Sequence, residues 1–297
     1  VVNSIADLRT MGGTGNYALG SSLNFATETD LALGHNFAPI ATFADKFNGL
    51  GHTITGMKIS IAAANMGMFQ VVGADSDIRN IGLVGGNVSG AAGSGGLIGS
   101  GTTGNVANSY NTGSVLGAAG TGGLVGSITT GSISNSFTTG KVTGDAGTGG
   151  LVGAITSGGI SASYATGEVS GHGATGGLVG EITTGAIRES YATGKVSGRV
   201  GTGGLAGTAA TGSITNAYAS GSVVGSTAAG GLVGSTTGSV TNTYASGSVT
   251  GTTSPGGLLG SKGASSVLTN NFWNLASDDH AVGDIAGTAS DGATGIS

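Results

Sequence analysis

The chain has 297 residues, of which 65 are glycine and 2 are proline, and it has no cysteine. Charged side chains make up 8% of the residues, hydrophobic ones 38%, and the formal net charge is −5. This composition excludes a disulfide framework and cysteine-ligated metals, a basic nucleic-acid-binding surface and charge-driven disorder. No apolar run is long enough to span a membrane as a helix.

The N-terminal part, residues 1–82, lacks a strict repeat and carries most of the larger polar side chains. Residues 4–11 predict a short helix with Ser4 as its N-cap. Runs of β-forming residues between turn residues predict strands in three segments: 17–25, 37–43 and 52–61. Because a naked terminal coil would expose an open sheet edge, we expect residues 1–82 to be the irregular capping part of a larger repeat structure.

A repeat dominates residues 83–269. The pentapeptide Gly-Gly-Leu-X-Gly occurs seven times, at intervals of 27 residues five times over and then of 26. Self-similarity at a fixed period of this length indicates a repeat architecture. Its leucines are Leu97, Leu124, Leu151, Leu178, Leu205, Leu232 and Leu258. Residues 67–69 (Gly-Met-Phe) resemble a degenerate copy, with Met68 placed 29 residues before Leu97.

Three further positions of the repeat keep their residue type. One is a branched aliphatic residue: Val106, Ile133, Ile160, Ile187, Ile214 and Val240. Four residues later comes an aromatic residue: Tyr110, Phe137, Tyr164, Tyr191, Tyr218 and Tyr244. The third is always valine: Val115, Val142, Val169, Val196, Val223 and Val249. Apolar residues alternate with Ser, Thr or Asn between the first two positions, which is the period of a β-strand.

Such a unit cannot bury its own apolar side, but stacked copies can. The sequence therefore predicts an all-β fold, a parallel, right-handed β-helix with one coil per repeat and about 4.8 Å between coils. We expect leucine, isoleucine and valine ladders inside. We also place the aromatic ladder inside, although the small residue before each ring would equally suit a tight corner with the ring outside. Glycine should supply positive φ at the corners, so Gly177→Val should be destabilising.

Charged residues occupy columns in which the sign alternates between neighbouring coils. One column reads Ser114, Lys141, Glu168, Lys195 and Ser222, and another reads Asp145, His172 and Arg199. Like charges at strand spacing would repel. We expect both columns to face outward as weak ion-pair ladders.

The tail, residues 270–297, breaks the repeat with the sequence Asn-Asn-Phe-Trp and adds four aspartates. It predicts either a closing coil or the start of a further module. Because the chain begins at Val1 without a signal peptide, we expect a mature form or an excised piece of a longer protein.

The repeats resemble the GLUG motif, whose Gly-Leu-Val-Gly core is seen at residues 123–126. The segment 43–59 is similar to the sequence that precedes such arrays, with Asn48 and Leu50 replacing the usual Asp and Asn, and the Asn-Asn-Phe-Trp tail is similar to their end. The resemblance implies a β-helical segment of a secreted bacterial surface exoprotein similar to filamentous haemagglutinins. Such arrays also lie beside the protease domain of immunoglobulin A peptidases.

Motifs for catalysis or cofactors are weak or absent. Residues 171–176 match G-x-G-x-x-G, but they span a repeat junction rather than a strand-to-helix turn, so we expect no cofactor. There is no HExxH, and the four histidines lie far apart. The densest acidic group is Glu168, Glu181 and Glu189 with Arg188 and Lys195, which we interpret as a solvated face rather than a polysaccharide-cleaving site. Asp278, Asp279 and Asp284 form the one candidate calcium loop.

Ice binding is a non-enzymatic alternative, because flat solenoid faces with ranks of hydroxyl groups can order water. A first rank runs through Thr112, Thr139, Thr166, Thr193, Ser220 and Ser246, and a second through Thr103, Thr130, Ser157 and Thr184. Aromatic and charged residues lie two positions from the first rank and interrupt the regular Thr-X-Thr pattern that such a face requires.

The sequence therefore predicts a non-enzymatic shaft or adhesin segment, located outside the cell or on the bacterial surface. Its expected partners are a host-cell, matrix or glycan ligand and an outer-membrane two-partner transporter during export. Neither nucleic acid nor a membrane span is expected, and no catalytic, metal or cofactor residue is assigned. The alternatives are an ice-binding solenoid and an accessory repeat region of a secreted peptidase or polysaccharide-acting enzyme.

Overall fold

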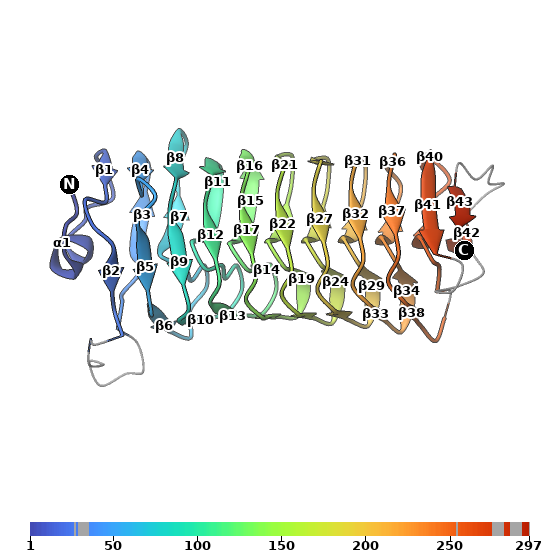
Figure 1. The fold of residues 1–297 in the computed structure, drawn as a ribbon, viewed down its shortest axis with the longest axis horizontal. Helices are drawn as coiled ribbons and strands as arrows, with labels where there is room; N and C mark the ends of the chain where they lie inside the picture. The colour runs from blue at the N-terminus through green and yellow to red at the C-terminus, as the bar shows by residue number, and fades with distance from the viewer. Residues whose placement is uncertain (27, 29–35, 254, 275–281, 286–292, 297) are drawn as a thin grey trace.

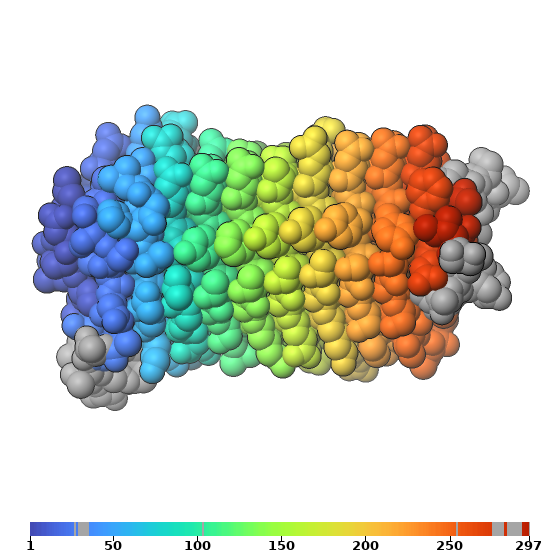
Figure 2. Space-filling model, in the orientation of Figure 1, coloured from blue at the N-terminus to red at the C-terminus, as the bar shows by residue number. Residues whose placement is uncertain are grey.

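The chain forms a rod of stacked parallel β-coils, in which successive coils follow one another along the long axis (Figures 1 and 2). The computed structural model describes residues 1–26, 28, 36–253, 255–274, 282–285 and 293–296. Every strand pair in these ranges is parallel, and each strand hydrogen-bonds to its equivalent in the next coil. The predicted all-β parallel solenoid is thus confirmed.

The largest sheet, sheet I, has 19 strands in two rows that the long strand β11 joins. Row Ia contains β3 (Ile40–Phe43), β7 (Phe69–Val72), β11 (Ile98–Ala107), β15 (Val125–Thr130), β20 (Val152–Ile155), β25 (Val179–Ile182), β30 (Ala206–Ala209), β35 (Val233–Thr236), β39 (Leu259–Lys262) and β42 (Val282–Ile285). Row Ib contains β1 (Tyr17–Ala18), β4 (Lys46–Asn48), β8 (Ser76–Arg79), β16 (Ser132–Ser134), β21 (Gly159–Ser161), β26 (Ala186–Arg188), β31 (Ser213–Thr215), β36 (Ser239–Thr241) and β40 (Val267–Thr269).

Three smaller sheets form the other sides of the rod, and sheet IV is present only in the middle coils. Sheet II has 11 strands: β2 (Leu23–Asn24), β5 (Thr53–Thr55), β9 (Gly82–Val84), β12 (Tyr110–Asn111), β17 (Phe137–Thr138), β22 (Tyr164–Ala165), β27 (Tyr191–Ala192), β32 (Tyr218–Ala219), β37 (Tyr244–Ala245), β41 (Asn271–Asn274) and β43 (Ala293–Ile296). Sheet III has 8: β6 (Lys58–Ser60), β10 (Asn87–Ser89), β13 (Ser114–Leu116), β18 (Val142–Thr143), β23 (Val169–Ser170), β28 (Val196–Ser197), β33 (Val223–Val224) and β38 (Val249–Thr250). Sheet IV has 5: β14 (Thr121–Gly122), β19 (Ala146–Gly149), β24 (Gly173–Gly176), β29 (Val200–Gly203) and β34 (Thr227–Gly230).

The pairing register places equivalent repeat residues above one another. Ile133 pairs with Ile160, and Val142 pairs with Val169, each shifted by one repeat. The leucine, isoleucine and valine ladders are all buried, and the repeat leucines are fully so. The predicted aliphatic interior is therefore present, and it supplies most of the apolar burial that stabilises the stack.

The N-terminal coils use the same register with larger core residues. Phe69 pairs with Ile98, so Met68 occupies the leucine position as the sequence predicts. The cores of these coils hold buried phenylalanines, and the rings of Phe43 and Phe69 lie 4.7 Å apart. The predicted helix is α1 (Ile5–Arg9), which lies at the N-terminal end of the rod (Figure 1). Its cap is a box in which Ser4 and Asp7 each accept from the other's backbone N–H.

Two expectations about glycine need correction. Gly177 does not have positive φ; instead, a Cβ at this position would lie under 3.0 Å from the carbonyl oxygen of Gly204 in the next coil. The same contact recurs down this glycine column, so close backbone stacking excludes a side chain there. Positive φ occurs at other corners, where many of the residues are asparagine rather than glycine.

The tail begins as a further coil. Strand β41 pairs with β37, so that Phe272 lies above Tyr244 and Trp273 above Ala245. Trp273 is buried, and a Cβ on Gly257 would collide with its indole ring. Residues 271–274 therefore continue the solenoid, and β43 pairs with β41 in turn.

Candidate functional site

The aromatic column faces outward from sheet II, contrary to the expectation that it fills the core. Ala192 of β27 and its equivalents point inward and are buried, whereas Tyr191 and its equivalents are half-buried or exposed. The strands that carry the rings follow one another along the side of the rod that Figure 1 turns toward the viewer. We call the aromatic column, together with the corner residues two positions before each ring, the aromatic face.

The rings of five successive coils form a continuous stack. The centroids from Tyr110 through Phe137, Tyr164 and Tyr191 to Tyr218 are 4.7–4.9 Å apart, and the ring planes are within 5° of parallel. This spacing equals the distance between paired strands, so the register itself imposes the stacking. Burial, and secondarily the charge of Tyr191, raises the pKa of the Tyr164 and Tyr218 phenols. These phenols stay neutral at ordinary pH.

An asparagine ladder, which the sequence reasoning missed, runs beside the rings. Its members have φ between +48° and +55°, a region that asparagine tolerates better than most residues. The ladder comprises Asn80, Asn108, Asn135, Asn216, Asn242 and Asn270, and it is interrupted by Ala162 and Glu189. Asn108 donates its amide N–H to Asn80 at 3.1 Å, and Asn242 donates to Asn216 at the same distance. The recurring asparagine two residues before the aromatic position was the available sequence signal.

A buried serine ladder holds the corner beneath the aromatic face. The backbone N–H of Ser136 donates to the hydroxyl of Ser163 at 3.1 Å, and that of Ser163 donates to Ser190 at 3.2 Å. Each hydroxyl also donates to a carbonyl two residues earlier in its own coil. The series changes at Ala217, which has no hydroxyl, and at Thr243 in the following coil.

The ring stack ends at Tyr218, in the same coil in which Ala217 interrupts the serine ladder. Tyr244 pairs with Tyr218 in backbone register, and Phe272 pairs with Tyr244, but neither ring joins the parallel stack. A surface hollow of about 320 Å³ opens here, and we call it the C-terminal groove. It is lined by Asn216, Ala217, Tyr218, Asn242, Thr243, Tyr244, Asn270 and Phe272.

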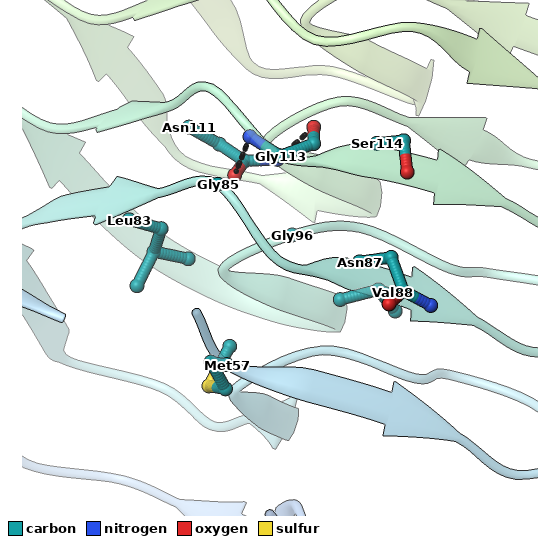
Figure 3. Close-up of a pocket in the computed structure, with 9 residues that line it drawn as sticks. All are labelled: Met57, Leu83, Gly85, Asn87, Val88, Gly96, Asn111, Gly113 and Ser114. Carbon is teal, nitrogen blue, oxygen red and sulfur yellow. Dashed lines mark hydrogen bonds between the residues drawn. The ribbon is translucent and has the colours of Figure 1, made fainter. Parts of the chain in front are cut away.

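Three other hollows lack the aromatic rings that line the C-terminal groove. A small cavity between the early coils has a volume of about 10 Å³ and is lined by Met57, Leu83 and Asn111 among others (Figure 3). It is large enough for one water molecule at most. Two surface hollows, of about 370 and 390 Å³, are lined mainly by small or aliphatic residues around Val200 and Ile40. None of the three contains an aromatic ring.

The two ranks of hydroxyl groups considered for ice binding differ in whether their hydroxyls already have hydrogen-bond partners within the chain. Thr130, Ser157 and Thr184 of the second rank donate to carbonyls of the preceding coil, so these hydroxyls already have partners. The side chain of Thr103 lies outside the described residues. Residues of the first rank, such as Thr139 and Thr166, are exposed on the far side of the aromatic rings from the asparagine ladder. The rings project beside this rank, which is therefore not a flat hydroxyl surface.

The structure does not bring the acidic residues that the sequence analysis grouped into one site. Glu181 lies on row Ia, Arg188 lies on row Ib, and Glu168 precedes β23 of sheet III, where it pairs with Lys141 at 3.2 Å. Asp145 pairs with His172 at 2.8 Å in the second predicted charge column. Within the described residues, no three His, Asp or Glu side chains come close enough to share a metal ion. Asp278, Asp279 and the Asp284 side chain lie outside those residues.

Comparisons with known proteins agree with the repeat and the fold. No helix of the described chain is long and apolar enough to cross a membrane, and no curated protein sequence matches the chain. A Bacteroides ovatus structure proposed to be an immunoglobulin A1 protease has a TM-score of 0.57 and 24% identity over 75% of each chain. A structure named IgA1 Protease has a TM-score of 0.46 and 16% identity, over 99% of this chain and 21% of its own. Residues 171–197 and 198–224 match the GLUG motif, so the chain contains a GLUG repeat region.

Proposed function

We propose that the chain is a rigid, non-enzymatic shaft of a secreted bacterial surface exoprotein, and that it attaches to cells or matrix through the aromatic face. The observation that carries this proposal is the aromatic face itself. A column of aromatic rings that could have filled the core instead lies half-buried or exposed along the outside of the rod, beside a ladder of amides. Exposed aromatic and amide groups in a continuous patch are typical of recognition surfaces.

The contacts between successive coils support the shaft role. Each coil contacts its neighbours through backbone hydrogen bonds on several sides and through the buried ladders, so the stack resists bending between coils. A rod of this kind projects whatever it carries away from a surface. Export by a two-partner transporter, as for proteins similar to filamentous haemagglutinins, fits a chain whose coils stack in the order in which they occur in the sequence.

The non-enzymatic assignment is supported by the distribution of ionisable groups. Glu181 lies on β25 of sheet I and Glu168 precedes β23 of sheet III, so these two acids are not paired as the acid and base that catalysis requires.

A second candidate is an accessory repeat region beside a peptidase domain. The observation that favours it is the fold shared with the Bacteroides ovatus structure proposed to be an immunoglobulin A1 protease. In that role the rod would position a catalytic domain or its substrate. The sequence that flanks these repeats in the full-length gene product distinguishes the two, because a peptidase domain there supports the accessory role.

Attachment is tested with the full chain, labelled with a fluorophore and incubated with cultured epithelial cells and with immobilised matrix proteins. Saturable binding that unlabelled chain competes away is expected. The heat-unfolded chain serves as the control for non-specific adhesion. No saturable binding to either surface contradicts the attachment role and leaves a passive spacer.

A further inference from the structure

The C-terminal groove places rings outside the parallel stack beside an unbroken part of the asparagine ladder. In the middle of the rod, each ring is covered on both faces by its neighbours, and the asparagine ladder is interrupted at Ala162 and Glu189. At the C-terminal end the ring stack opens, and the asparagine ladder is continuous through three coils. Rings with uncovered faces therefore lie beside an unbroken row of amides.

The rings at the groove present faces as well as edges. Tyr218 is covered by Tyr191 on one side only, and Tyr244 and Phe272 are outside the stack. Their exposed fractions are 40%, 36% and 42%. The C–H bonds on one side of a pyranose ring pack against the electron-rich face of an aromatic ring, which stacked rings cannot offer.

The amides supply polar contacts at the same place. Asn242 donates one N–H to Asn216 at 3.1 Å, and Asn270 donates one to Asn242 at 3.2 Å. An amide has two N–H donors and an oxygen with two lone pairs, so each of these exposed side chains keeps further capacity. The ladder bonds also fix the amide orientations, which lowers the entropy lost when hydroxyl groups of a ligand bind.

The charge of the lining defines the class of ligand. No Lys, Arg, His, Asp or Glu contributes to the groove, so nothing there compensates an ionic group on a ligand. The pattern of aromatic faces and neutral amides fits the alternating C–H and O–H surfaces of a neutral sugar. Successive positions along the groove repeat at the strand spacing of about 4.8 Å, a length comparable with one pyranose unit of an extended chain.

We propose that the C-terminal groove binds a short stretch of a neutral glycan, with the sugar rings against Tyr218, Tyr244 and Phe272 and their hydroxyls bonded to the asparagine ladder. This inference rests on the proposed function, since it names the chemistry that the shaft would recognise.

The test uses the full chain and a panel of neutral oligosaccharides: cellohexaose, mannohexaose, xylohexaose and maltohexaose. Polygalacturonate and heparin fragments serve as charged comparators. Isothermal titration calorimetry measures affinity, and the fluorescence of the single tryptophan, Trp273, reports binding because this residue adjoins Phe272. We expect at least one neutral oligosaccharide to bind and to shift the Trp273 emission.

Matched variants locate the site. Tyr244→Ala should weaken binding about tenfold, whereas Leu116→Ala truncates an exposed apolar side chain of sheet III, outside the aromatic face, and should leave the affinity unchanged. Asn242→Gly keeps the positive φ of that corner and removes the amide, and it should weaken binding several-fold. Its control, Asn135→Gly, makes the same change at an equivalent corner away from the groove. Circular dichroism of each variant establishes that it is folded.

Three results would overturn the glycan site: no neutral oligosaccharide binds, a charged fragment binds more tightly, or Tyr244→Ala binds as well as the parent chain. A dimer that Tyr244→Ala converts to a monomer, without glycan binding, would assign the groove to self-association instead. Cell attachment without glycan binding overturns this inference alone. Glycan binding without cell or matrix attachment overturns the proposed function and leaves the glycan site standing.

Discussion

The glycine column at the start of each repeat is the most demanding packing feature of the rod, and Gly177→Ala probes it. A Cβ at Gly177 would lie under 3.0 Å from the carbonyl oxygen of Gly204 and 2.9 Å from the Cβ of Ala192. Neither neighbour is the end of a flexible side chain. The two coils would therefore have to move apart until this contact reaches an ordinary van der Waals distance, against the backbone hydrogen bonds that join them.

The cost follows from overpacking and from the weakened coil-to-coil contacts. Inserting a methylene into a well-packed core typically costs about 1–3 kcal/mol, and here rigid backbone opposes it. We expect Gly177→Ala to lower the free energy of unfolding by about 3 kcal/mol. Gly159→Ala is the matched control, because its Cβ would meet only the Ala186 carbonyl oxygen at the ordinary distance of 3.5 Å. Since alanine restricts the unfolded chain more than glycine does, this control should be neutral or stabilising by about 0.4–1 kcal/mol.

Urea unfolding followed by circular dichroism measures both variants against the parent chain. Because repeat proteins need not unfold in one step, Trp273 fluorescence is recorded as a second probe at the C-terminal end. A Gly177→Ala protein as stable as the parent would refute the close-stacking explanation. Equal damage from Gly159→Ala would show that loss of any glycine, rather than contact with the next coil, is responsible.

Three further predictions concern the buried hydroxyls and the tyrosines. Ala217→Ser should restore the serine ladder and raise the free energy of unfolding by about 1 kcal/mol in urea titrations; a loss of stability would contradict the ladder geometry. The Thr202 hydroxyl is buried without a hydrogen-bond partner, whereas the Thr148 hydroxyl donates to a carbonyl. In the same assay, Thr202→Val should therefore raise the free energy of unfolding by about 1 kcal/mol, and Thr148→Val should lower it by about 1 kcal/mol. The pKa values of Tyr164 and Tyr218 are raised above 10.0 in the folded chain, because folding favours the neutral phenols. The stability of the folded chain that depends on these neutral phenols is therefore complete below pH 10.0, and it is lost as the pH rises through the folded pKa values. The melting temperature measured against pH should fall in that window, and a flat profile would contradict the burial of these phenols.

The repeat made most of the fold predictable. Seven aligned leucines and the alternating residues around Ile160 define both the period and the inward positions, and parallel stacking is the arrangement that buries them all. The N-terminal helix and the equivalence of Met68 to the repeat leucine were predictable for the same reason, since local caps and spacing survive where the repeat decays.

The side on which the rings lie was not predictable from period alone. Alternation from Ile133 to Phe137 would place both side chains inward, because they are four residues apart. Asn135 lies between them with φ of +48°, and this corner reverses the alternation so that the next inward residue is Ser136. A sequence pattern assigns faces only while the backbone stays extended. The outward position of the rings therefore could not be predicted without the positive φ of one corner residue in each coil, such as Asn135.

The central claim, attachment through the aromatic face, is tested most directly by cell binding of the labelled full chain with two variants measured in parallel. We expect saturable binding by the parent chain, a loss of about tenfold in affinity for Tyr244→Ala, and unchanged binding for Leu116→Ala, which truncates an exposed side chain of sheet III outside the aromatic face. Binding that is equal in all three proteins, or absent from the parent chain, would contradict it.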